Sequence, residues 1–330
     1  MQNAPNHANV AIYRRKNRDF MSQEEIKQKE YPSPKKESGE EIKRTKRGVL
    51  FLVLSAFFFA LMGLFVRLSG DLPTFQKCFF RNAIAMIVAF IILCKNRSFR
   101  IKKGSLPALF ARSIAGTVGI VCNFYAIDHL PVSDASILNK LSPFFSVIFS
   151  AIILRERANW KDWLFVGVAF FGALFVVKPS FASTTAFPAF IGVLGGLGAG
   201  LAYTFVRYLG GRGVPASMIV FFFSTFSCLS VLPMTILSFT PMTFMQVLFL
   251  LLAGLCASCA QFSITKAYSY APAKEISVYD YSQVLFSALL GLIFLAELPD
   301  LLSFIGYIII IGSAVAKYLL SYKKHKAGTR

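Results

Sequence analysis

Charged residues are scarce in this sequence, at 15% of its 330 residues. A soluble chain of this length needs more polar side chains to cover its surface, so the scarcity excludes a soluble globular fold. Histidine is scarcer still, because His7, His129 and His325 are the only three and none lies in a long apolar stretch. A serine–histidine dyad or a histidine metal site inside a membrane is thereby excluded, and we expect no metal and no cofactor. The phosphate-binding pattern G-x-x-x-x-G-K-S/T is also missing, which speaks against ATP as an energy source.

Apolar residues, in contrast, make up 55% of the chain and come in long blocks. About 20 consecutive apolar residues span the hydrocarbon core of a bilayer as a helix, whereas outer-membrane strands would show shorter, alternating segments. We therefore predict an all-α membrane protein with ten transmembrane helices and no room for a soluble catalytic domain. The predicted spans are residues 48–68, 73–94, 105–127, 131–154, 161–178, 187–208, 215–238, 242–266, 272–295 and 300–320.

The placement of the basic residues, which give a net charge of +19, indicates the topology. They cluster in residues 1–47, in the loops after the second, fourth and sixth predicted spans, and in residues 321–330. The loops near residues 70, 129, 240 and 298 contain no lysine or arginine. Positive charge marks cytoplasmic loops, so we expect both termini in the cytoplasm and the chain in a bacterial cytoplasmic (inner) membrane. The same placement speaks against nucleic acid as a partner.

The two ends of the chain differ from the apolar region between them. Residues 1–47 are polar and show no apolar period, so we predict a disordered basic N-terminal tail. Residues 321–330 form a short basic tail that we expect in the cytoplasm. Met1 and Met21 both remain candidate translation starts.

Residues 48–178 and 187–320 repeat one another in sequence. Phe65-Val66-Arg67 matches Phe205-Val206-Arg207, and nearly the same register aligns Glu156 with Glu297. Each half contains five predicted spans, an odd number, so the second half is inverted relative to the first. Inverted repeats are a transporter architecture in which the binding site lies near the bilayer midplane between the halves. We therefore expect two inverted five-helix repeats around a central cavity.

The stretch of residues 111–176 resembles the EamA-type domain of the drug/metabolite transporter superfamily. The features that carry the resemblance are Arg112, Tyr125-Ala126, Pro131, Leu141-Ser-Pro143, Arg155-Glu156, Gly167 and Gly172. The second half is similar through Ala267-Tyr268, Pro272, Ala296-Glu297, Gly306 and Gly312, and it departs at Val284, where the first half has Pro143. The resemblance implies a ten-helix basket over residues 48–320, with a central cavity lined chiefly by helices 1, 3, 4, 6, 8 and 9.

Lys140 and Asp280 lie deep inside predicted spans, where an ionisable group needs a partner, water or a functional role. Each follows the proline that opens its helix by eight or nine residues, a rise of roughly 12–14 Å. The two helices start from opposite membrane faces, so both side chains are expected near the midplane. Two interpretations stay open. The residues line the solute path, with Asp280 as a candidate for proton coupling, or they form an ion pair that only holds the halves together.

The other candidates for the solute path are polar side chains in apolar helices, and each type has a structural alternative. Tyrosines can be ordinary packing, amides can be hydrogen bonds between helices, and arginines can reach the lipid headgroups. We favour that last role for Arg81, whereas Arg112 is also a candidate for attracting an anionic or zwitterionic solute. The candidates are Tyr279, Tyr281, Asn139, Asn123, Gln261, Gln283 and Arg112.

We interpret the chain as a secondary transporter or exporter that moves a small organic metabolite or amphiphile by alternating access. Transport would be facilitative or coupled to protons or another ion, and import and export are both open. The expected partners are a small-molecule substrate and the lipid bilayer, and a homodimer is left open. A non-transporting scaffold or sensor is the main alternative. An intramembrane enzyme has less support, because Asp280 is the only aspartate expected near the midplane and a paired-aspartate protease needs two.

Overall fold

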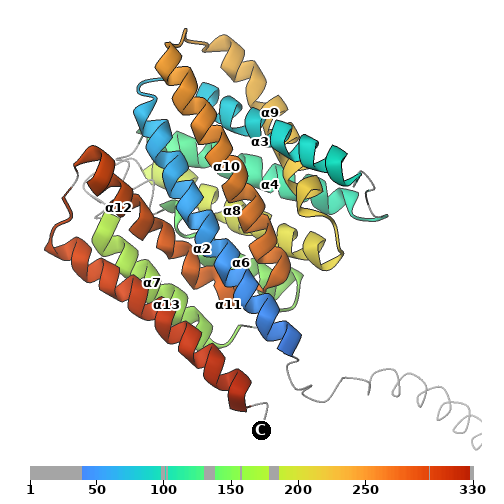
Figure 1. Cartoon of the computed structure of the whole chain (residues 1–330), viewed down its shortest axis with the longest axis vertical. Helices are drawn as coiled ribbons and strands as arrows, with labels where there is room; N and C mark the ends of the chain where they lie inside the picture. Colours follow the sequence, from blue (N-terminus) through green and yellow to red (C-terminus); the bar gives the residue numbers. More distant parts are fainter. Residues whose placement is uncertain are drawn as a thin grey trace, which may run out of the picture.

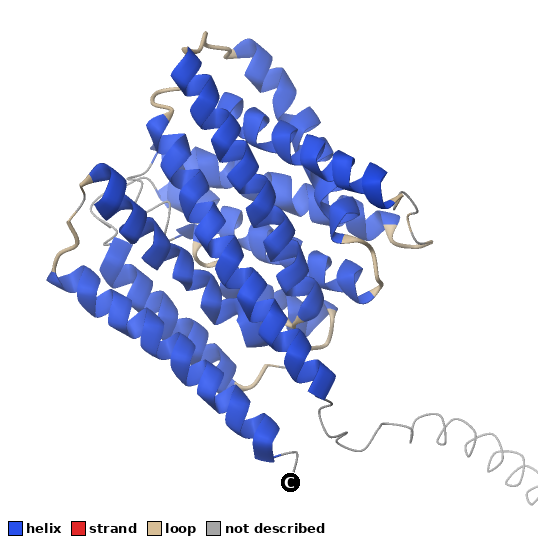
Figure 2. Ribbon diagram, viewed as in Figure 1, coloured by secondary structure: helices blue, strands red, loops and turns tan. Residues whose placement is uncertain are grey.

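The structure, a computed structural model, describes residues 39–97, 101, 103–129, 138–156, 158–177, 186–296 and 298–327. Every regular element within these residues is a helix (Figure 1, Figure 2), which confirms the predicted fold class. The elements are α2 (Gly39–Leu68), α3 (Thr74–Asn96), α4 (Leu106–His129), α6 (Ser142–Ile153), α7 (Trp160–Val177), α8 (Ala186–Gly211), α9 (Ala216–Leu237), α10 (Phe244–Tyr270), α11 (Ala273–Ile276), the 3₁₀ helix η1 (Ser277–Tyr281), α12 (Ser282–Leu295) and α13 (Leu301–Ala327).

Eight helical stretches of the described chain are long and apolar enough to cross a membrane. They coincide with eight of the ten predicted spans, and the stretch Ala273–Leu295 counts as one of them. The other two predicted spans correspond to α7 and to the shorter α6, which has 12 residues. Residues 131–137 of that last span, including Pro131 and Asp134, lie outside the described residues.

Both predicted tails contain helical residues that the sequence analysis did not anticipate. α2 begins at Gly39, inside the predicted tail of residues 1–47, and α13 continues to Ala327, inside residues 321–330. Tertiary contacts support the early start of α2. Thr45 donates a hydrogen bond to Glu275 over 2.9 Å, and a Cβ at Gly48 would lie 2.8 Å from the Cβ of Ala271. Residues 1–38 lie outside the described part of the chain.

The helices of the two halves pack against each other in pairs. α2 lies along α10, α3 along α9, α4 along α8 and α7 along α13, and Figure 1 shows the last pair at one edge of the bundle. Glycines allow the closest of these approaches. A Cβ at Gly198 of α8 would lie 2.8 Å from the carbonyl oxygen of Ala115 in α4. The glycines of α8 from Gly192 to Gly200 therefore serve close helix packing, as small residues do in membranes.

The ninth predicted span, residues 272–295, is interrupted where we expected one continuous helix. α11 ends after one turn at Ile276, the chain continues as the 3₁₀ helix η1, and α12 begins at Ser282. Serine side chains stabilise the interruption. Ser277 donates a hydrogen bond to the carbonyl of Ala273 (2.6 Å), and Ser282 donates one to Tyr279 (2.7 Å). Such local bonds compete with α-helical pairing, and a 3₁₀ turn within a helix often marks a functional site.

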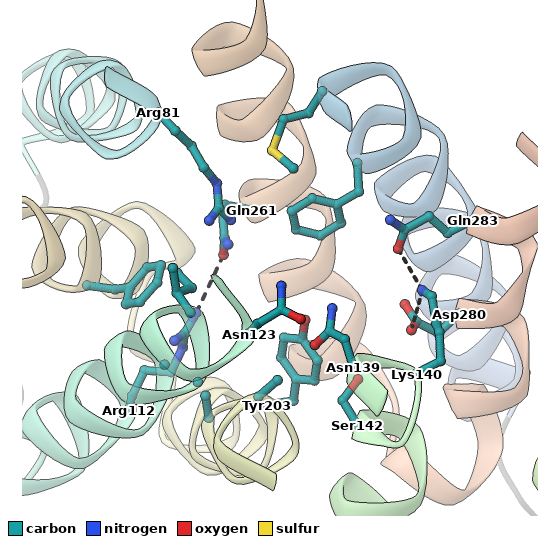
Figure 3. Close-up of a pocket in the computed structure, with 18 residues that line it drawn as sticks. Arg81, Arg112, Asn123, Asn139, Lys140, Ser142, Tyr203, Gln261, Asp280 and Gln283 are labelled. Atoms are coloured by element: carbon teal, nitrogen blue, oxygen red, sulfur yellow. Dashed lines mark hydrogen bonds and ion pairs between the residues drawn. The ribbon is translucent and has the colours of Figure 1, made fainter. Parts of the chain in front are cut away.

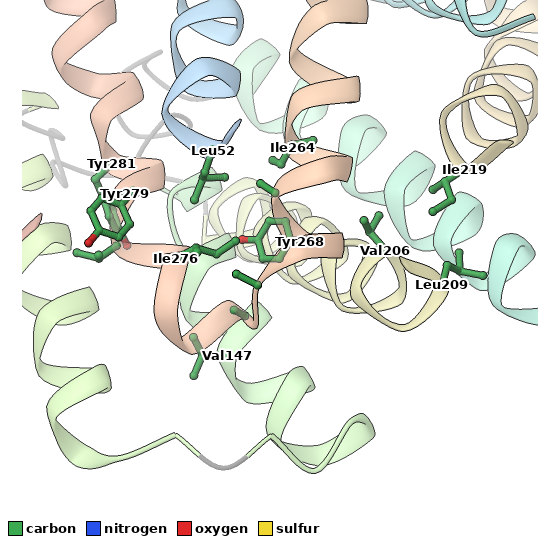
Figure 4. Packing of buried hydrophobic residues seen from close by; sticks show 14 of the residues in the cluster. Leu52, Val147, Val206, Leu209, Ile219, Ile264, Tyr268, Ile276, Tyr279 and Tyr281 are labelled. Carbon is green, nitrogen blue, oxygen red and sulfur yellow. The ribbon is translucent and has the colours of Figure 1, made fainter. Parts of the chain in front are cut away.

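A dense apolar cluster fills the side of the molecule where α2 begins and α10 ends (Figure 4). Leu52, Ile276 and Tyr268 are buried there. Tyr268 also stacks on Tyr203, with ring centroids 5.0 Å apart. Large apolar side chains are exposed on the outside of the bundle instead, among them Phe171, whose exposed fraction is 62%. An apolar exterior around a partly polar interior is the arrangement that a lipid environment requires.

Candidate functional site

A cavity of about 160 Å³ lies at the centre of the bundle, between helices of both halves. Its walls come from α2, α3, α4, α8, α9, α10, η1, α12, the chain just before α6 and the first residue of α6 (Figure 3). Most of its lining residues are polar or small rather than large and apolar. They are Phe59, Met62, Arg81, Arg112, Gly116, Gly119, Ile120, Asn123, Asn139, Lys140, Ser142, Ala199, Ala202, Tyr203, Phe223, Gln261, Asp280 and Gln283.

An ion pair between the two halves lies at one end of this cavity. Lys140 Nζ lies 3.4 Å from Asp280 Oδ2 and donates a second hydrogen bond to Gln283 Oε1 over 2.7 Å (Figure 3). Both charged residues are buried, with exposed fractions of 9% and 7%. Burial makes each charge dependent on the other, since a single unpaired ion in this environment would cost several kcal/mol.

Irregular backbone presents both charges to the cavity. Asp280 belongs to η1, and Lys140 lies in the turn that precedes α6. The Tyr281 hydroxyl joins the two irregular segments by donating to the backbone carbonyl of Lys140 (3.0 Å). Non-helical backbone at membrane depth is tolerated where it is buried in protein or lines a cavity, and interrupted helices of this kind form binding sites in transporters.

Two arginines lie at the other end of the cavity. Arg112 of α4 is buried (exposed fraction 3%), and its guanidinium lies 4.0 Å from the ring centroid of Phe223. It donates a long hydrogen bond, 3.5 Å, to Gln261 Oε1. Arg81 of α3 approaches from the opposite side, 6.0 Å from the ring centroid of Phe59. Neither arginine has a carboxylate within 4.0 Å in the described residues.

Two polar atoms of the cavity wall, one at the arginine end and one between the two ends, have no hydrogen-bond partner among the described residues. Arg112 Nε and Asn123 Oδ1 are buried, and no described residue provides a hydrogen bond to either atom. Asn139, Ser142 and Tyr203 also line this middle part of the cavity (Figure 3). Buried polar atoms without partners are rare in proteins and call for an explanation such as bound water, an ion or a ligand.

A second cavity, of about 460 Å³, begins where the first one ends. Lys140 and Gln283 line both of them. The remaining walls come from the second half of α2, from α12, from the chain that leads into α13 and from α13 itself. The hydrogen-bonded pair of Lys140 and Gln283 therefore stands between a central polar space and a space toward the end of the bundle where α2 ends and α13 begins.

The structure brings seven of the nine predicted path residues to the central cavity. Tyr279 and Tyr281 are not among its lining residues, because Tyr281 is fully buried and its ring packs on Phe170 at 6.4 Å. Tyr279 belongs to the apolar cluster. The seven that line the cavity are Lys140, Asp280, Asn139, Asn123, Gln261, Gln283 and Arg112. That they bind a solute stays a prediction.

Among the lining residues that sequence reasoning did not predict are Arg81 and Tyr203. Arg81, which we expected at the headgroups, lines the cavity instead, because α3 turns that face toward the bundle axis. A signal was available, since Arg81 lies eight residues past Pro73, just as Asp280 lies eight past Pro272. Tyr203 offered no comparable signal, because a single tyrosine in an apolar helix is usually packing.

Comparison with known proteins agrees with this architecture. The EamA-like transporter family matches residues 46–178 and 186–318, one match for each half. The chain is 33% identical over 273 residues to the pseudopaline exporter CntI of Pseudomonas aeruginosa strain UCBPP-PA14, covering 82% of this chain and 95% of that protein. It is 26% identical to human solute carrier family 35 member G1, covering 84% of this chain and 81% of that protein. It is 22% identical to the riboflavin transporter of Brucella anthropi, covering 74% of this chain and 87% of that protein.

A solved crystal structure shares the fold. It superposes with a TM-score of 0.71 at 17% identity, covering 84% of this chain and 98% of the other. Apolar helices, a polar centre between two inverted halves and a family match to each half thus point to one conclusion. The chain is a multi-pass membrane protein that belongs to the EamA-like transporter family.

Proposed function

We propose that the chain is a secondary transporter that carries a small organic solute through the central cavity by alternating access. The observation that carries the proposal is the buried polar cavity between the halves, with its ion pair and its unpartnered polar atoms. A scaffold would have no use for such a cavity, because burying these groups costs free energy. The volume, about 160 Å³, is below the roughly 300–1,000 Å³ of drug-sized ligand pockets and favours a small solute.

Different packing at the two ends of the bundle supports alternating access. One end holds the second cavity, beyond Lys140 and Gln283. At the other end, Tyr203 stacks on Tyr268 above the apolar cluster, and Arg207 pairs with Glu156 at 2.9 Å. With both termini in a bacterial cytoplasm, as the loop charges favour, the packed end faces inward and the second cavity faces outward.

Asp280 is our candidate for coupling transport to protons. Its carboxylate is the partner of Lys140, so a proton on Asp280 would release the lysine that stands between the two cavities. Solute binding could break the same pair, which would let one contact serve both binding and gating. A facilitative transporter would use the pair in the second way only.

A solute identified by a thermal-shift screen of small organic metabolites provides the test. We expect purified full-length chain in proteoliposomes to move the labelled solute, and Asp280→Asn and Lys140→Ala to abolish this flux per folded molecule. Unchanged flux in both variants would contradict the proposal. An imposed pH gradient should change the rate if protons are coupled, whereas indifference indicates a facilitator. A solute that binds but does not cross indicates a sensor, and one that is chemically converted indicates an enzyme.

A further inference from the structure

Positive charge dominates the central cavity. Its lining contains three basic side chains, Arg81, Arg112 and Lys140, and one acidic side chain, Asp280. The cavity thus carries a net charge of +2, since the described lining residues include no histidine and no second carboxylate. Like charges held in a space of low dielectric repel each other and have lost much of their hydration. An anion that enters this space relieves both costs.

The two arginines share one part of this space. Figure 3 shows Arg81 and Arg112 extending from different helices toward the region of Gln261. Aromatic rings, Phe59 and Phe223, lie beside the guanidinium groups and contribute no formal negative charge. Arg112 Nε is a buried donor without an acceptor among the described residues, and the bond to Gln261 is long. The arginine end thus offers several N–H donors to a group that this part of the chain does not supply.

We infer that the transported solute is an organic dianion, with one carboxylate bound between Arg81 and Arg112. This inference rests on the transport function proposed above. A guanidinium presents its donors in a planar fork that matches a carboxylate, and such charged hydrogen bonds are about twice as strong as neutral ones. The rest of the solute lies along Asn123, Asn139 and Tyr203, toward Lys140. Its second negative charge competes with Asp280 for Lys140 and opens the pair.

A series of small probes that differ in charge tests the inference on detergent-purified full-length chain. The probes are succinate, its monoamide, its diamide, the diamine putrescine and inorganic phosphate. We expect thermal stabilisation in the order succinate, monoamide, diamide, with none from putrescine. Phosphate distinguishes a carboxylate site from a phosphate site, because only a carboxylate-selective site is stabilised more by succinate than by phosphate.

Arginine variants complete the experiment. Arg81→Gln and Arg112→Gln should each weaken succinate binding about tenfold or more, the effect of losing a charged hydrogen bond. Arg212→Gln is the matched control, since Arg212 is an exposed arginine at the end of α8 and should leave binding unchanged. Arg112→Lys replaces Arg112→Gln if the latter does not fold, and it should bind succinate more weakly than the wild type.

The outcomes separate this inference from the transport proposal. The inference that the solute is a dianion is overturned if the diamide or putrescine stabilises the protein as much as succinate does. It is also overturned if neither arginine variant affects succinate binding. Both results leave the transport proposal intact. No response to any anion also overturns it. If succinate binds through the arginines but no solute crosses proteoliposomes, the dianion-binding site holds, whereas the transport proposal fails and with it the assignment of the dianion as a transported solute.

Discussion

The two ends of the central cavity hold positive charge in different ways. At one end, Lys140 is neutralised by Asp280 and hydrogen-bonded to Gln283. At the other, Arg81 and Arg112 lie beside aromatic rings and an amide, with no carboxylate within 4.0 Å in the described part of the chain. A closed pair costs less in the empty protein than an unpaired buried ion and can be exchanged for a ligand, whereas unpaired cations attract an anion from the start. The comparison suggests that the arginine end recognises the solute and the lysine end responds to it.

The largest effect should come from breaking the closed pair. Asp280→Asn leaves Lys140 buried without a counter-charge, and we expect a loss of stability of about 3–5 kcal/mol together with loss of flux. Thermal unfolding in detergent and flux in proteoliposomes measure the two effects. The double variant Lys140→Gln/Asp280→Asn should recover most of the stability but none of the flux.

A second lysine–aspartate pair, which is part-buried, provides the control. Lys317 of α13 contacts Asp162 of α7, away from the cavity. Asp162→Asn should lower stability by a comparable amount and leave the flux per folded molecule unchanged. Equal loss of flux in both variants would mean that the Asp280 effect is structural and would remove the distinction between the two ends.

A smaller effect should follow from moving the arginine end without changing its charge. Gly198→Ala places a Cβ 2.8 Å from backbone atoms of Ala115 and Gly119, so α4, which carries Arg112, must shift. We expect a destabilisation of about 1–3 kcal/mol and weaker solute binding, measured by thermal unfolding and titration. Gly167→Ala is the control, because a Cβ there meets nothing within 4 Å and should be neutral or slightly stabilising.

The smallest effect should come from the ring beside Arg112. Phe223→Leu keeps an apolar side chain but removes the aromatic face 4.0 Å from the guanidinium. Losing this cation–π contact should lower the stability of the protein by about 0.5–2 kcal/mol. We expect solute binding, measured by titration, to change by a few fold at most while the Lys140 end is unaffected. Phe222→Leu removes a neighbouring ring that packs on Phe110 instead, and a result like that of Phe223→Leu would assign the effect to packing alone.

Sequence patterns predicted how deep the site residues lie in the membrane, but not which of their side chains face the cavity. Counting residues from Pro272 placed Asp280 near mid-membrane, and the same count from Pro73 would have placed Arg81 there. Depth does not tell which way a side chain points. Tyr281 is next to Asp280 in sequence, yet it packs on Phe170 and donates to the carbonyl of Lys140, outside the cavity.

The interruption of the ninth predicted span shows that the sequence patterns also did not predict the local backbone conformation. Residues 272–295 are apolar enough to predict one helix, and the serines within them fit a helix as well as a break. The break depends on partners from distant segments, since Ser277 meets Ser146 at 3.1 Å and Tyr281 meets Lys140. A local pattern contains no information about these contacts.

The sequence by itself determined the membrane class, the approximate spans, the two inverted halves and the family, because each depends on composition, periodicity or repetition along the chain. Only the tertiary structure decided the pairing of helices between halves, the position of Arg81 and the separation of the cavity into a paired and an unpaired end. The physical reason is that the net charge of a site depends on which side chains share one space, and not on their order along the chain. Arg81, Arg112, Lys140 and Asp280 come from four distant segments, and they form one electrostatic site only after packing brings them together.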